Sequence, residues 1–152
     1  MNRRTRGWLV GFATVVAIQA LRMPVRNERA PGGFAAPTTV QSAVRAACFQ
    51  CHSEHARWPW YAQIAPVSWF IHAQVGEARK RLNFTAWKDY LYDPGTAARK
   101  FGAIDQMVRS GAMPPWYFRA LSARGRLTPA QRAAIESWAI EGRADALKAE
   151  SH

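Results

Sequence analysis

The sequence predicts an all-α domain, and three observations support this class. Apolar residues recur at helical spacing in three stretches, Val40–Cys48, Phe101–Val108 and Ile135–Gly142. Prolines and glycines separate these stretches, and the sequence has no pattern of strands alternating with helices. With 152 residues, of which 49% are hydrophobic, the chain is long enough to bury one core. We therefore predict one helical domain over residues 40–150.

The first 25 residues resemble a targeting segment. Arg3, Arg4 and Arg6 precede an apolar run from Gly7 to Leu21, which is shorter than the roughly 20 residues that span a bilayer. No small-x-small triplet closes the run, so an uncleaved membrane anchor over 1–25 is favoured over a removed signal peptide. Both interpretations place the domain outside the cytoplasm, because the arginines stay inside.

Residues 26–39 contain two prolines and two adjacent glycines, which predict a flexible linker. The first helix of the domain should begin near Thr38 or Thr39, because a threonine side chain can cap a helix N-terminus. Its alanines would let another helix approach closely. Its apolar face leads directly into Cys48.

The pentapeptide Cys48-Phe49-Gln50-Cys51-His52 has the form C-x-x-C-H, which is typical of c-type heme attachment. Positions i and i+3 of a helical turn share a face, so both thiols can reach one porphyrin edge and form two thioether links. His52 follows directly, and its neutral imidazole is a good iron ligand. The motif predicts one heme c, attached through Cys48 and Cys51.

Three other readings of the pentapeptide stay open. A thioredoxin-like redox pair needs a βαβ context, which the sequence does not show. A zinc site would have to use Cys48, Cys51, His52 and His55, a very compressed set with no second ligand pair downstream. The third is a plain disulfide. We favour heme over all three.

An aromatic segment follows the pentapeptide, and Pro59 within it disfavours a helix. We expect a loop that wraps the heme edge. The guanidinium of Arg57 and the indole N–H groups of Trp58 and Trp60 are candidate donors to the heme propionates. Ordinary packing of the two tryptophans is the alternative.

A second helix should begin with Pro66 at its first position and end in the basic run Arg79-Lys80-Arg81. His72 lies within it and is a possible second axial ligand, although a lone helical histidine is more often a packed or surface residue. His55 is a poorer candidate, since it lies only three residues from His52.

The remaining elements follow from cap and turn residues. Thr85 is the expected N-cap of a short helix. Asp93-Pro94-Gly95 should form a turn, followed by a helix over Thr96–Ser110 that stops at Gly111. The last helix should open with Thr128 as N-cap and Pro129 at N1. Within it, Gly142 could allow close crossing with the first helix of the domain or simply fray the end.

Met113 precedes two prolines that hold the backbone extended, so its direction is fixed. A thioether is a soft, neutral ligand that suits low-spin heme iron opposite histidine. We predict Met113 as the axial ligand across from His52. A methionine that fills a core gap is the alternative, and Met107 is the rival thioether, although its helical face already accounts for it.

The chain resembles the bacterial heme-binding-domain family, which is itself similar to class I c-type cytochromes. The resemblance covers about Val44 to Trp138. The residues that carry it are Cys48-Phe49-Gln50-Cys51-His52-Ser53, Trp58-Pro59-Trp60-Tyr61, Ile64-Ala65-Pro66-Val67-Ser68-Trp69, Leu82-Asn83-Phe84 with Trp87, and Gly111-Ala112-Met113-Pro114-Pro115. The resemblance implies covalent heme with His52 proximal and Met113 distal. Members often carry a histidine after the Met-Pro-Pro stretch, and this chain has none there, so we infer no ligand from that segment.

These observations predict a cytochrome c-like helical domain around one covalent heme, at the periplasmic side of the bacterial inner membrane. Its expected work is one-electron transfer with membrane or periplasmic redox proteins, rather than enzyme catalysis. The net charge is +11, and without the four arginines that flank the N-terminal run 17 basic residues remain against 10 acidic ones, an excess of +7 that suits heme propionates and an acidic partner. The basic residues are scattered without a nucleic-acid-binding module, so we expect no nucleic acid. The alternatives are a peroxidase-like enzyme or gas sensor with an open sixth iron position, for which His72 with Arg79 is a weak pair, and a module whose heme only stabilises the fold.

Overall fold

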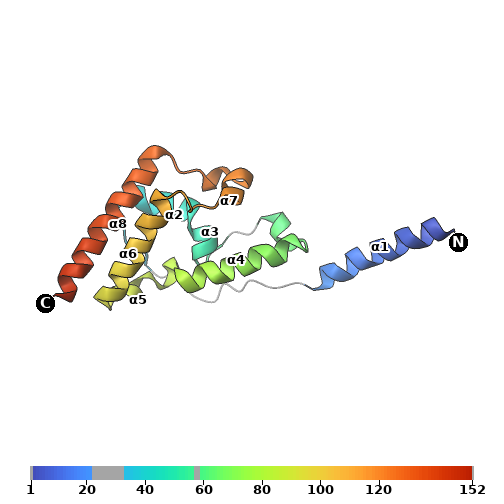
Figure 1. The fold of residues 1–152 in the computed structure, drawn as a ribbon, viewed down its shortest axis with the longest axis horizontal. Helices are drawn as coiled ribbons and strands as arrows, with labels where there is room; N and C mark the ends of the chain where they lie inside the picture. Colours follow the sequence, from blue (N-terminus) through green and yellow to red (C-terminus); the bar gives the residue numbers. More distant parts are fainter. Residues whose placement is uncertain (1, 22–32, 57–58, 152) are drawn as a thin grey trace.

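The computed structural model describes residues 2–21, 33–56 and 59–151. Over these residues the chain forms eight α-helices and three short 3-10 helices, with no strand, which confirms the all-α prediction (Figure 1). The elements are α1 (Arg3–Ala20), α2 (Thr38–Ala47), α3 (Phe49–His52), η1 (Trp60–Gln63), α4 (Val67–Arg81), η2 (Phe84–Ala86), α5 (Trp87–Leu91), α6 (Pro94–Arg109), α7 (Trp116–Leu121), η3 (Ala123–Gly125) and α8 (Pro129–Glu150).

The long helices α6 and α8 lie side by side and form one wall of the domain (Figure 1). Helix α2 packs against α8, where Ala43 of α2 and Ala139 of α8 are fully buried. Helix α3 follows α2 directly and packs against α4. The segment formed by α2 and α3 therefore links α8 to α4.

Phe34 is the centre of an aromatic core. Its ring lies 5.0 Å from the ring of Phe84 and 5.5 Å from those of Trp87 and Trp138, in edge-to-face arrangements that aromatic quadrupoles favour. Only 2% of Phe34 is exposed. The residue lies inside the segment predicted as a linker, so part of that segment belongs to the core.

Two predicted helix ends are confirmed. The Thr128 side chain accepts a hydrogen bond from the Gln131 backbone N–H, and the Gln131 side chain accepts one from the Thr128 backbone, so a complete capping box opens α8. Gly111 has a φ of 72° directly after α6, a conformation that glycine adopts without the steric cost of a Cβ.

One predicted cap is absent, and three predicted boundaries are wrong by one to a few residues. Helix α2 begins at Thr38, as predicted, but Pro37 precedes it and no side chain caps it. Pro66 precedes α4 instead of occupying its first position. Asn83, not Thr85, caps the turn at η2, because its side chain accepts from the Thr85 N–H. Asp93 caps α6 through the Thr96 N–H, so Pro94 and Gly95 are helical.

Gly142 lies against α6, not against the first helix of the domain. A Cβ at Gly142 would overlap the ring of Phe101. That ring is itself wedged 5.1 Å from the rings of both Trp87 and Trp138. Gly142 therefore permits the close packing of α8 on α6.

Helix α1 extends away from the rest of the molecule and buries none of its residues (Figure 1). Its last turn is tied to the domain by Gln19, which donates to the Ala65 carbonyl oxygen (3.2 Å) and accepts from the Ala65 N–H (3.0 Å). Within residues 2–21, 33–56 and 59–151, no helix has the length and apolarity to cross a membrane. Part of the predicted anchor over 1–25 lies outside the described residues, and the anchor stays a prediction.

Candidate heme-binding cavity

One cavity of about 550 Å³ lies where α2, α3, α4, α6 and α7 meet. Its volume falls in the range of roughly 300–1,000 Å³ that is usual for ligand pockets. Cys48, Cys51, His52 and Met113 all line it. Most of the remaining wall is apolar and includes Val44, Leu82, Phe84, Ile104, Val108 and Ile135. The four side chains predicted to hold heme therefore share one apolar cavity, and their role as ligands stays a prediction.

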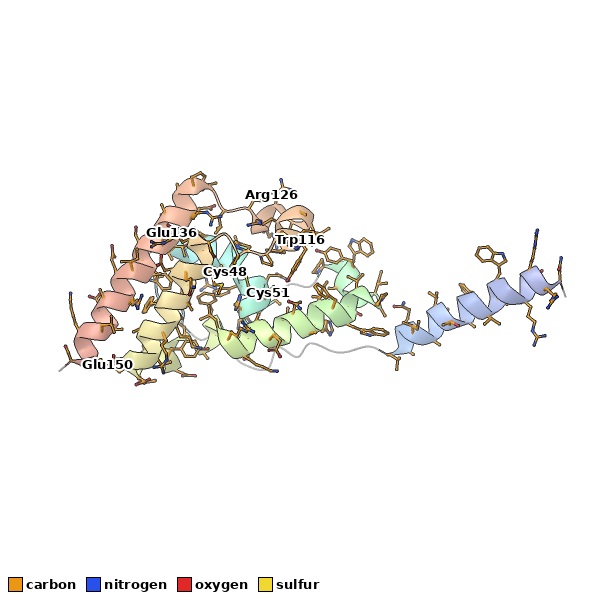
Figure 2. The ribbon with its side chains drawn as sticks, viewed as in Figure 1. Cys48, Cys51, Trp116, Arg126, Glu136 and Glu150 are labelled. Carbon is orange, nitrogen blue, oxygen red and sulfur yellow. The ribbon has the colours of Figure 1, made fainter. Side chains whose placement is uncertain are left out.

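A single helical turn places the two thiols together. Cys48 ends α2, and its carbonyl oxygen accepts hydrogen bonds from the N–H groups of Cys51 (3.2 Å) and His52 (2.9 Å). This turn brings Cys48 and Cys51 to the same side, inside the body of the molecule (Figure 2). Ser53 then ends the turn, because its hydroxyl donates to the Phe49 carbonyl oxygen (2.7 Å) and the His55 N–H donates to that hydroxyl.

Both thiols are free, and burial keeps them protonated. Burial in the apolar wall, assisted by the neighbouring Cys51, raises the pKa of Cys48 to about 12. Burial also raises the pKa of Cys51, although the positive charge of Arg79 opposes this shift. At neutral pH the cavity therefore presents two thiols rather than thiolates.

His52 is held in one tautomer by the backbone. Its Nδ1 atom lies 2.9 Å from the carbonyl oxygen of Leu82, and because a carbonyl can only accept, Nδ1 must donate. Nε2 then carries the lone pair that a metal ligand needs. Burial lowers the pKa of His52, while hydrogen bonds to the carbonyls of Leu82 and Ala78 oppose the shift, so the ring stays neutral.

Met113 enters the cavity from the loop between α6 and α7. Its N–H donates to the Met107 carbonyl oxygen (3.0 Å), which folds the loop back on the end of α6. Arg119 of α7 donates to the Gly111 carbonyl oxygen (2.9 Å) and ties the other side of the loop. Pro114 and Pro115 also line the cavity. These bonds fix the backbone that carries the Met113 thioether.

One edge of the cavity is polar and basic. Gln74, Glu77 and Arg81 lie on one face of α4, and Lys100 reaches across from α6. The Lys100 ammonium donates to the Arg81 carbonyl oxygen (2.5 Å) and stands 4.8 Å from the centre of the Tyr90 ring. Glu77 is paired with Lys80 outside the cavity, so Arg81 and Lys100 dominate the charge of this edge.

Of the three predicted propionate donors, the structure describes only Trp60, and Trp60 does not lie at the cavity. Trp60 is 74% exposed on η1 and is not part of the cavity wall. The expected loop at this point is a short 3-10 helix, Trp60–Gln63. Arg57 and Trp58 lie outside the described residues.

Two alternative interpretations, a zinc site and a peroxidase-like heme site, can be compared with this geometry. In the part of the chain that the structure describes, no group of three or more His, Cys, Asp or Glu side chains is arranged to hold a metal ion, which leaves the zinc reading without support. His55 and His72 do not line the cavity, and neither does Arg79. The weak His72 and Arg79 pair of the peroxidase-like reading is therefore not part of this site.

Sequence reasoning missed the basic edge. Arg81 belongs to the run Arg79-Lys80-Arg81. From the sequence alone, this run was explained only by the favourable interaction of positive charges with the C-terminal end of a helix. Lys100 lies in α6, and a lysine is expected at the surface because of its charge. The available signal was spacing, because Ile104 is four residues after Lys100 and both face the cavity.

Two thiols on one helical face, a neutral imidazole and a thioether around an apolar cavity form a donor set that fits heme c. A family model described as "Haem-binding domain" matches residues 10–141 of the chain. No curated protein and no solved structure matched in the two other comparisons.

Proposed function

The chain belongs to the haem-binding domain family, and from this premise we propose that it is a c-type cytochrome that carries one heme for one-electron transfer. The heme is attached through Cys48 and Cys51, and its iron is bound by His52 and Met113. The observation that carries the proposal is the shared cavity, because these four side chains come from α2, α3 and the loop after α6 and still line one space.

The thiols supply the attachment. Each thiol would hold one vinyl group of the porphyrin: its S–H would add across that double bond, with the carbon–sulfur bond at one carbon and the hydrogen at the other. Cys48 and Cys51 are three residues apart on one turn, which matches two neighbouring attachment points on one porphyrin edge.

The axial side chains set the redox behaviour. When bound, heme supplies an iron that cycles between the ferric and ferrous states. The neutral His52 ring offers Nε2 to the iron. The Met113 thioether is a soft donor that favours the less charged ferrous iron, so it raises the reduction potential of the heme. A site closed by two protein ligands needs little rearrangement when one electron is gained or lost.

The basic edge would hold the propionates. Arg81 and Lys100 lie at the cavity wall, and cationic nitrogen donors bind carboxylates through charge-assisted hydrogen bonds. This assignment replaces Trp60, which is exposed and lies outside the wall.

We also propose that the domain works on the periplasmic side of the bacterial inner membrane, with membrane or periplasmic redox proteins as partners. Attachment of heme to a C-x-x-C-H motif takes place on that side, and the arginines ahead of the apolar N-terminal run favour the same orientation. The excess of basic residues favours an acidic surface on the partner.

The test is the absorption spectrum of the heme-loaded protein, before and after carbon monoxide is added to the reduced form, followed by a redox titration. A low-spin spectrum that carbon monoxide leaves unchanged, with reversible one-electron reduction, would support the carrier. A high-spin or readily carbonylated heme would contradict the Met113 assignment and favour an enzyme or gas sensor. A heme that cannot be reduced reversibly would favour a purely structural role.

A further inference from the structure

We propose that Glu54, Asn83, Thr85 and Tyr90 form a polar clasp that positions His52 by fixing the carbonyl group of Leu82, and that this clasp tunes the potential of the heme. The inference rests on the proposed function, since it assigns positioning residues to the same axial ligand. The clasp begins two residues after His52 and one residue after Leu82, so it joins both ends of the hydrogen bond between them.

Asn83 is the centre of the clasp. It is 9% exposed, and three of its polar groups are bonded. Its backbone N–H donates to the Tyr90 hydroxyl (3.0 Å), its Oδ1 accepts from the Thr85 N–H (3.0 Å), and its Nδ2 donates to Glu54 Oε1 (2.9 Å). Because a backbone N–H can only donate, the Asn83 side-chain atom that it contacts must be the oxygen, Oδ1. The NH2 group of that side chain therefore faces Glu54.

A second bond closes the clasp on the His52 side. The backbone N–H of Glu54 donates to the Thr85 hydroxyl (2.9 Å). Glu54 is thus bonded to the segment after Leu82 through both its main chain and its side chain. These bonds fix the position of the segment after Leu82 relative to the segment after His52, although the two lie about 30 positions apart in the sequence. The Leu82 carbonyl points at His52 Nδ1 as a result.

The consequence for the heme follows from the Nδ1 hydrogen bond. A carbonyl acceptor at Nδ1 increases the basicity of Nε2 and fixes the ring orientation. A more basic ligand stabilises ferric iron and lowers the potential. Asn83 and Thr85 are buried, and Glu54 and Tyr90 are half-buried, so these bonds are at least partly shielded from water. The loss of one partner therefore costs more than it would at an exposed position. Loosening the clasp should therefore raise the potential.

The first test replaces one hydroxyl. Tyr90→Phe removes the acceptor of the Asn83 N–H and keeps the ring beneath the Lys100 ammonium. Tyr92→Phe is the matched control, because Tyr92 lies two residues away and is 85% exposed. We expect Tyr90→Phe to raise the potential and to move the paramagnetically shifted heme-methyl resonances, which report ring orientation. Tyr92→Phe should leave both unchanged.

The second test isolates the side-chain bond. Glu54→Gln and Glu54→Leu both remove the carboxyl group, but only glutamine keeps an oxygen that can accept from Asn83 Nδ2. The leucine variant should therefore have the higher potential of the two, by up to about tenfold in the ferrous-to-ferric ratio, or about 59 mV for one electron. This pair also decides the matter if Tyr90→Phe does not fold.

The possible outcomes distinguish a failure of the clasp proposal from a failure of the proposed function. Variants that carry covalent heme but share the potential and heme-methyl shifts of their controls would overturn the clasp alone. Wild-type protein without covalent heme, as read from its intact mass, would overturn the proposed function and the clasp with it.

Discussion

The Nδ1 atom of His52 lies 2.9 Å from the carbonyl oxygen of Leu82, although 30 residues separate the two in sequence. This contact joins the C-x-x-C-H turn to the end of α4. It also decides which ring nitrogen is available to a metal, because the carbonyl can only accept and Nδ1 must carry the proton. A histidine that is neutral, half-buried and restrained in this way is prepared for ligation before any heme is present.

Replacing Met113 by alanine should open one iron position. The loss of the thioether should turn a low-spin spectrum into a high-spin one, allow carbon monoxide to bind the reduced protein, and lower the potential by more than about 59 mV, a tenfold change. Met107→Ala is the control, since Met107 also lines the cavity but belongs to α6. Equal spectra for the two variants would show that Met113 is not the ligand.

Removal of the Lys100 charge should lower the potential, which is the opposite of the effect expected for the clasp. The ammonium stands at the cavity edge, and a positive charge near the heme favours ferrous iron. Lys100→Gln should lower the potential by up to about 59 mV. Arg99→Gln removes the same charge from the neighbouring position, where the side chain is 72% exposed and faces Asp93. A shift of equal size in both variants would refute a specific role for Lys100.

Alkylation of the heme-free protein should reveal the burial of Cys48. The pKa of this thiol rises from 9.0 to about 12 on folding, so the folded state holds the proton more tightly. The contribution of Cys48 to the free energy of unfolding is therefore complete below pH 9 and is lost as the pH rises toward 12. At pH 8, iodoacetamide should modify Cys48 up to about 1,000-fold more slowly in the folded chain than in urea, because the two pKa values differ by about three units. Peptide mass mapping would measure the two rates, and equal rates would contradict the burial.

Alanine at Gly142 should destabilise the domain. The added Cβ would overlap the ring of Phe101, which cannot move aside because tryptophans flank it. Such overpacking costs about 1–3 kcal/mol, against a gain of about 1 kcal/mol in helix propensity. Gly76→Ala in α4 meets no atom within 4 Å and should stabilise by about 0.5–1 kcal/mol. Urea unfolding of both variants gives the signs, and a stabilised Gly142→Ala would show that α6 and α8 are not so closely packed.

Local sequence signals predicted the parts of the fold that depend on neighbouring residues. Thr128 with Gln131, and Gly111 after α6, could be identified because a cap involves only a few adjacent positions. The prediction at Asp93-Pro94-Gly95 failed because the same residues suit a turn and a helix start. The Asp93 side chain bonds to Thr96 and continues into the helix.

The cavity wall could be predicted only in part, because it depends on packing between segments that are distant in the sequence. The motif predicted Cys48, Cys51 and His52, and its implied sixth ligand drew attention to Met113, which the fold brings to the same cavity. Lys100 and the Leu82 carbonyl could not be found this way, because their roles depend on where the end of α4 meets α6 and the α3 turn. The burial of Phe34 likewise depends on partners 50 or more residues away.

The most direct test of the central claim is the intact mass of the denatured protein after expression with a periplasmic heme-attachment system. The wild-type chain should gain the mass of one heme, and the heme should stay with the protein through acid extraction. The Cys48→Ala and Cys51→Ala double variant should gain nothing, while His52→Ala should lose the low-spin spectrum in any chain that still carries heme. A wild-type chain with the mass of the bare polypeptide, or a double variant that keeps its heme after extraction, would contradict covalent attachment at these two cysteines.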